Sequence, residues 1–230
     1  MRALGTALLA AALLALRAAD SSAQVYVGGG GTPHGGSIEL SGGGAFVSGF
    51  DMGSQTATLT RSTSDTRFDL FTSDSRVDGF PGLFARAGLY ITRAISIEGG
   101  VRYARPKLAV RLTGDAESAP NETATETATH YVFDGTVLFH FTGLSFGGGR
   151  GMPFVAGGGG YLRELHEKNE VVETGSEYHV TGGLKYWFGD GDRRFGLRVE
   201  AGVSVREKGF DNGDERRALP MVLGGVSYLF

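Results

Sequence analysis

Apolar and polar residues alternate along much of this chain with the two-residue period of a β-strand that has one apolar and one polar face. The stretch of about residues 176–188 shows the pattern clearly, because its even-numbered positions from 178 onward are apolar or Gly while its odd-numbered positions include His179, Thr181 and Lys185. The same alternation recurs in seven other segments. The eight predicted strands cover about residues 37–47, 81–92, 95–103, 128–142, 153–167, 176–188, 194–206 and 219–230.

The connections between these strands alternate between short turns and longer polar segments. The short turns lie at 93–94, 145–151 and 189–192, and the longer segments at 51–79, 114–127, 166–175 and 207–215. Transmembrane β-barrels show this asymmetry, with short periplasmic turns and long extracellular loops. Parts of segment 51–79 have strand-like composition without a clean apolar row, so whether it extends the barrel wall stays open.

Two further features of the strands carry structural expectations. Pro106 interrupts the third strand, and Leu108 and Val110 then place apolar residues on the opposite parity from Ile97 and Val101, so we expect a bulge there. Aromatic residues gather near strand ends and predict a girdle at the periplasmic side. The predicted girdle comprises Tyr90, Phe141, Phe154, Phe188, Phe195, Tyr228 and Phe230.

Composition narrows the class of protein. The 230 residues include 39 Gly, placed inside apolar runs without the Gly-X-Y period of collagen, and no Cys, which excludes disulfides and thiolate chemistry. A formal net charge of −3 without a basic cluster gives no sign of a nucleic-acid partner. Mean hydropathy of −0.07 argues against a polytopic helical membrane protein, although it is compatible with alternating strands.

The amino terminus reads as a secretory signal. Arg2 precedes an apolar run from Ala3 to Leu16, and Ser21-Ser22-Ala23 provides a small-x-small cleavage site. The apolar run is too short to span a bilayer as a helix. We therefore expect a signal peptide over residues 1–23, a Gly-rich lead over 24–36 and a barrel over 37–230.

The polar face of the predicted strands carries charged residues of both signs. Inside an eight-stranded barrel, where side chains fill the available space, such charges must be paired. We expect a salt-bridge network that plugs the lumen, with Arg198 and Glu200 at its centre; the alternative is a conducting or gated pathway. The residues assigned to the lumen are Glu39, Arg86, Glu98, Arg102, Asp134, Arg163, Lys185, Arg198 and Glu200.

Other candidate chemistry is weak. His179 with Thr181, and Glu164 or Glu200 nearby, has the residue types of a lipid-modifying hydrolase, but the alternation places His179 inside the barrel and away from lipid. The remaining histidines lie on separate strands or loops, and the Gly-rich stretch 147–151 lacks the Lys-Ser/Thr of a phosphate-binding loop. We assign no catalytic residue, no cofactor and no metal.

The last strand, 219–230, ends on an aromatic residue, with Val226, Tyr228 and Phe230 on one face. This ending resembles bacterial outer-membrane β-barrels, in which such a strand is the signal read by the barrel-assembly machinery. The segments 139–141, 153–160, 182–187 and 195–200 are similar to the OmpA/OmpX-like barrel family. In full-length OmpA-type proteins a peptidoglycan-binding domain follows the barrel, whereas we expect none after the last predicted strand of this chain.

Together these features predict a closed antiparallel eight-stranded up-and-down transmembrane barrel in the outer membrane of a Gram-negative-type cell. The first strand, 37–47, must then pair with the last, with Val226, Tyr228 and Phe230 facing outward beside Ile38 and Leu40. We expect a monomer that contacts outer-membrane lipid and has a structural or surface-recognition role. The alternatives are a lipid-modifying hydrolase, or a soluble periplasmic ligand-binding barrel, which needs its apolar row inside.

Overall fold

A computed structural model describes residues 33–60, 67–117, 119–166, 171–189, 194–207 and 216–230. All of them belong to one compact unit, Gly31–Phe230. The predicted signal peptide and most of the predicted lead lie outside the described residues. Among the residues described, no helix is long and apolar enough to cross a membrane.

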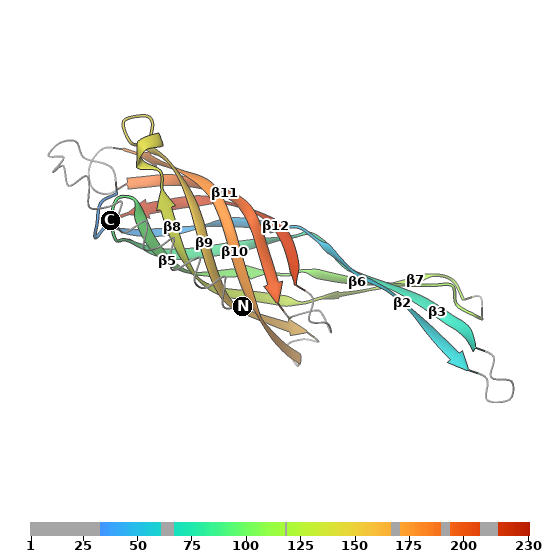
Figure 1. The fold of residues 1–230 in the computed structure, drawn as a ribbon. Helices are drawn as coiled ribbons and strands as arrows, with labels where there is room; N and C mark the ends of the chain where they lie inside the picture. Colours follow the sequence, from blue (N-terminus) through green and yellow to red (C-terminus); the bar gives the residue numbers. More distant parts are fainter. Residues whose placement is uncertain (1–32, 61–66, 118, 167–170, 190–193, 208–215) are drawn as a thin grey trace. The chain divides into compact units, whose positions relative to one another are not determined.

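Eight strands close into an antiparallel barrel in the order β1-β12-β11-β10-β9-β8-β5-β4, as the alternation predicts (Figure 1). Each barrel strand pairs with the neighbour expected of an up-and-down topology. The barrel strands are β1 (Ile38–Val47), β4 (Phe80–Tyr90), β5 (Ile95–Ala104), β8 (Thr129–His140), β9 (Gly151–His166), β10 (Val171–Phe188), β11 (Arg194–Glu207) and β12 (Arg217–Leu229).

The first and last strands close the ring. Glu39 lies opposite Leu229 in the β1–β12 register, and the Phe230 amide donates to the Ile38 carbonyl at 2.8 Å. Leu40 lies opposite Tyr228, and Val226 and Phe230 are exposed on the outer face. The predicted pairing and its facing are therefore confirmed.

Glycines make this seam possible. Gly43 on β1 and Gly225 on β12 lie opposite each other on the inward-facing row. A Cβ added at Gly43 would collide with the Gly224 carbonyl, and one added at Gly225 would collide with the Gly42 carbonyl. The two backbones can approach closely only because neither position carries a side chain.

A second sheet, in the order β2-β3-β6-β7, is built from the segments between the barrel strands on one side. Figure 1 shows β2 following β1 and β6 following β5. The single-turn 3₁₀ helix η2 (Thr142–Leu144) lies in the connection between β8 and β9. The strands of the second sheet are β2 (Phe50–Thr60), β3 (Arg67–Val77), β6 (Lys107–Thr113) and β7 (Glu122–Thr127).

This sheet answers the open question about segment 51–79 and corrects two expectations. The described part of 51–79 is mostly strand, and so is Glu122–Thr127, which was expected to be loop. No change of parity occurs at Pro106: the inward row of β5 continues through Pro106 to Leu108, which packs against the buried core at that end of the barrel. Leu108 and Val110 are apolar because they continue the inner face.

Two other expectations about the strands are wrong in detail. The predicted loop 166–175 is largely strand, since β9 reaches His166 and β10 starts at Val171. Tyr90 and Phe154 do not belong to an outer girdle, because both are buried inside the barrel. The other five predicted aromatics face outward, and several pack edge to face, as Tyr228 does with Phe195 and Phe230.

The barrel wall has an apolar outside and a closely packed inside. Its outer row leaves large aliphatic side chains exposed, including Leu83 at 63% and Val180 at 69%. Three apolar clusters lie inside; one contains Leu138, Phe154 and Ala156, and the other two lie one at each end. At the end where β1 leads to β2, called the sheet end here, the cluster contains Ala45, Val47, Val77, Phe80, Phe84, Ala104, Leu219, Met221 and Leu223. At the opposite, turn end it contains Tyr90, Met152, Trp187 and Leu229.

Candidate functional site in the barrel lumen

The charged residues predicted to face the lumen and found there come from six barrel strands. Because side chains alternate across a strand, every second residue of β1, β4, β5, β8, β10 and β11 points inward, and the closed ring directs all of them to one axis. The inward residues include Glu39, Arg86, Glu98, Arg102, Asp134, Lys185, Arg198 and Glu200, all of them buried.

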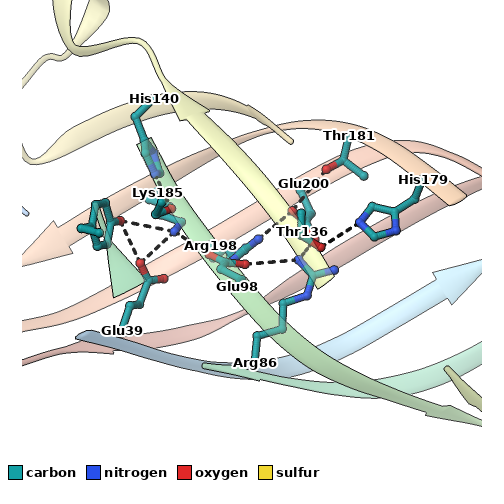
Figure 2. Close-up of polar contacts among 12 residues, drawn as sticks. Glu39, Arg86, Glu98, Thr136, His140, His179, Thr181, Lys185, Arg198 and Glu200 are labelled. Carbon is teal, nitrogen blue, oxygen red and sulfur yellow. Dashed lines mark hydrogen bonds and ion pairs between the residues drawn. The ribbon is translucent and has the colours of Figure 1, made fainter. Parts of the chain in front are cut away.

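Arg198 occupies the middle of this interior (Figure 2). Its Nη1 lies 2.8 Å from both carboxylate oxygens of Glu98, and its Nη2 donates to Glu200 Oε2 at 3.0 Å. Arg86 Nη1 donates to the other Glu200 oxygen at 2.8 Å. The planar guanidinium thus ties together two carboxylates, a geometry that a lysine at this position would not reproduce.

Lys185 extends the same network toward the turn end. Its Nζ donates to Glu39 Oε2 at 2.7 Å and to Glu98 Oε1 at 3.1 Å, and the Tyr90 hydroxyl donates to Glu39 at 2.9 Å. The Phe154 ring lies 5.5 Å from Lys185 Nζ and 5.2 Å from the Arg198 guanidinium carbon. The connected residues form what is called the central cluster: Glu39, Arg86, Tyr90, Glu98, Lys185, Arg198 and Glu200.

A second network lies closer to the sheet end. It is called the upper cluster and consists of Arg102, His130, Glu164, Glu177 and Arg206. Arg102 forms an ion pair with Glu177, and Arg206 Nε lies 3.3 Å from the same carboxylate. His130 Nδ1 lies 2.9 Å from Glu164 Oε1, and Arg206 Nη1 lies 3.8 Å from that oxygen. Each cluster therefore contains as many Glu carboxylates as Lys and Arg side chains, so the formal charges within each cluster balance in the buried interior.

Two predicted lumenal residues do not join these networks. Asp134 faces inward on β8, but neither carboxylate oxygen has a hydrogen-bond partner among the described residues. Arg163 was assigned to the lumen and is exposed on the outer face instead. Its neighbour Glu164 takes the inward position on β9.

The upper cluster contains the residues that sequence reasoning missed. Glu177 has the parity of His179 and Lys185, so extending that row by one step would have found it. Glu164 gave no comparable signal, because the four glycines from Gly157 to Gly160 leave no apolar row from which to read the phase of β9.

The residue types considered for a hydrolase are not brought together. His179 Nε2 lies 3.0 Å from Thr136 Oγ1, whereas Thr181 Oγ1 donates weakly to Glu200 at 3.5 Å. Glu164 is bound to His130. All of these side chains are buried inside the barrel, with no face toward the outer wall. Within the described part of the chain, no group of three or more residues has the arrangement of a metal site.

Little free space remains around the upper cluster. A cavity beside Phe80, Arg102, His130 and Arg206 has a volume of about 10 Å³. This is close to the smallest space that holds one water molecule. Buried apolar clusters lie toward both ends of the lumen, beyond the ionic networks.

Comparison with solved structures finds the same fold in an outer-membrane protein. The crystal structure of the outer membrane protein OprG from Pseudomonas aeruginosa matches with a TM-score of 0.50 and 12% sequence identity, over 86% of this chain and 98% of that one. At this identity the likeness shows the fold alone. No protein-family model and no curated protein matches the sequence. The particular similarity to the OmpA/OmpX-like family therefore stays a prediction.

Proposed function

We propose that this protein is a non-enzymatic outer-membrane barrel whose lumen is closed and whose second sheet serves structural or recognition roles at the cell surface. The observation that carries the proposal is the orientation of the wall. Apolar side chains such as Leu83, Val180 and Val199 stand exposed outside, while the charges lie within. Each such side chain gains about 1.5–3 kcal/mol when it leaves water for an apolar environment, so lipid is the favoured surroundings.

The same orientation is the reverse of what a soluble ligand-binding barrel requires. Such a barrel keeps its apolar row inside and its polar row in water. Here the inner row contains the ion pairs of both clusters, and closure leaves no strand edge for lipid to meet. The wall thus supports a location in a membrane over a location in the periplasm.

A closed lumen follows from the packing of the two clusters. An ion would have to displace buried side chains such as Arg198 and Arg206, whose partners would then lose their counter-charges. Removing one member of a buried pair costs about 3–5 kcal/mol. We therefore expect no steady conductance.

Recognition at the surface is supported by the outer face of the second sheet. A groove of about 710 Å³ lies on it. Its lining offers side chains of both signs and several hydroxyl and amide groups for polar contacts, drawn from Asp51, Ser54, Asp74, Arg76, Arg111, Asn121 and Thr123. The assembly role proposed for the last strand is supported by the outward facing of Val226, Tyr228 and Phe230.

Two measurements test the proposal. Fractionation of cells that express the full chain should recover it with outer membranes, and unheated protein should migrate faster than heated protein on a detergent gel. Recovery with soluble periplasmic proteins would overturn the proposal. In planar bilayers the folded protein should give no stable current; a large current that depends on Arg198 or Glu200 would show that the lumen conducts.

A further inference from the structure

The outer wall changes from apolar to basic at one boundary on β5 and β9, and on β8, which lies between them, it changes from apolar to a hydroxyl side chain at the same boundary. On β5 the outward row runs from Ile97 through Val101 to Tyr103 and continues with Arg105 and then Lys107 of β6. Parity is unbroken through Pro106, so all these residues share one face.

The neighbouring strands also have a tyrosine at this boundary. On β9 the outward row passes from Val155 to Tyr161 and then to Arg163, and on β8 it passes from Phe133 to Tyr131 and then to Thr129. A tyrosine thus ends the apolar row on three adjacent strands. Tyrosines favour the interface between hydrocarbon and water, where the ring is apolar and the hydroxyl is wet.

The tyrosines and the cations are adjacent across the strands. Tyr103 lies opposite Tyr131, with ring centroids 5.3 Å apart, and Arg163 lies opposite Tyr131 on the other side. Lys107 lies opposite Thr127, and Arg163 opposite Thr174, so hydroxyl groups flank the cations. The basic boundary, as this surface is called here, consists of Tyr103, Arg105, Lys107, Tyr131 and Arg163.

The side chains of the three cations of the basic boundary have no partner among the described residues. Arg105, Lys107 and Arg163 are exposed, and their side chains make no hydrogen bond or ion pair with any residue that the structure describes. Asp78 is an acid next to Lys107, because its amide donates to the Lys107 carbonyl, and its carboxylate is paired with Arg76 at 3.2 Å. The local charge therefore remains positive, although the whole chain is acidic.

The far side of the barrel differs. There the exposed Arg216 of the β11–β12 connection is paired with Glu207 at 3.3 Å. Arg105, Lys107 and Arg163 thus place three cations without described partners over β5, β6 and β9. Because these cations lie directly beyond the apolar wall, the negative charges that balance them have to come from the layer of the lipid headgroups.

We propose that the basic boundary binds the phosphate groups of an anionic lipid in the outer leaflet, with Arg105, Lys107 and Arg163 contacting phosphate and Tyr103 and Tyr131 lying against the upper part of the acyl chains. The inference rests on the proposed membrane location. Guanidinium groups match phosphate through paired hydrogen bonds, and cations at a membrane surface attract anionic lipid additively. Lipid is the committed source because the cations continue the lipid-facing row.

The test uses the full chain folded into phosphatidylcholine vesicles with or without a minor fraction of lipid A. After extraction into a nonionic detergent, native mass spectrometry measures the lipid A that stays bound. The variant R105Q/K107Q/R163Q should lose at least about tenfold in bound lipid A, because each surface cation contributes a severalfold effect. The charge-matched control R67Q/R93Q/R216Q, changed at exposed positions elsewhere, should retain the wild-type amount.

Further arms separate the explanations. R105K/R163K, which keeps both charges, should retain most of the bound lipid A, and excess inorganic phosphate should not displace it. Equal retention by the triple Gln variant and the wild type would overturn the proposal, as would displacement by inorganic phosphate, which would indicate a site for a free anion. Failure of the wild type to fold into vesicles, seen as loss of the fast-migrating gel band, would instead overturn the membrane location.

Discussion

The barrel and the second sheet are made from the same kind of strand yet meet opposite demands. In the barrel each strand has a neighbour on both sides, and inward charges such as Arg198 and Glu98 are buried and paired. In the second sheet β2 and β7 are edges, and charges such as Arg111 are exposed to solvent. The difference shows which region contributes more to the free energy of unfolding. A substitution inside the barrel disturbs a network of buried ion pairs, whereas a substitution in the second sheet disturbs one exposed side chain.

The largest expected effect is the loss of Arg198. The R198A variant leaves Glu98 and Glu200 buried with fewer partners, and should lower the free energy of unfolding by about 3–5 kcal/mol. Urea titration of the vesicle-folded protein, followed by the fluorescence of Trp187, the single Trp of the chain, measures the change. The control is R216A, which removes an exposed pair with Glu207 and should cost no more than about 1 kcal/mol. Equal effects of the two variants would break the comparison.

A smaller effect is expected at the β1–β12 seam. The G43V variant places a side chain where the Gly224 carbonyl lies, and should cost about 1–3 kcal/mol or prevent closure. The matched control is G224V, because a Cβ at that position meets nothing within 4 Å. The fraction of protein in the fast-migrating gel band reports closure; if G43V closes as well as G224V, the seam does not depend on the missing side chain.

The smallest effect is expected from shortening the second sheet. Replacing residues 55–73 by a short turn keeps Phe50, Met52 and Val77, which pack at the sheet end of the barrel. The free energy of unfolding should change by less than about 1 kcal/mol, because loop length alters closure entropy only weakly. The same urea titration applies. A loss comparable to that of R198A would mean that the second sheet supports the barrel as a whole.

The barrel was predictable because its lipid-facing row is apolar without a break, as in Leu83 to Leu89 on β4. The same alternation identified Arg198 and Glu200 as lumenal. Where the row was interrupted the prediction was wrong: the glycines before Tyr161 concealed the phase of β9, so Arg163 was placed inside and Glu164 was missed. Alternation also predicts which face of a strand a residue occupies, but not which residues it contacts. It therefore could not separate the central cluster from the upper cluster.

The second sheet was harder to predict for a physical reason. Most of its residues meet solvent on both faces, so the apolar row that marks a barrel strand is absent from β7 and broken in β3, although β3 is as long as the barrel strand β4. Leu108 and Val110 misled the assignment at Pro106 because the inner face becomes apolar where the charged lumen ends. When one face of a strand changes from charged to apolar, the sequence shows the same pattern as when the apolar residues move to the opposite face.

The register that joins Glu39 to Leu229 has a consequence for how the protein reaches its folded state. These two residues lie on the first and the last barrel strand, so the ring cannot close until the last strand has been synthesised. Contacts between distant segments form slowly because the intervening chain must first be ordered. Until then β1 presents an unpaired edge, and the nascent chain depends on being shielded from other strands in the interval.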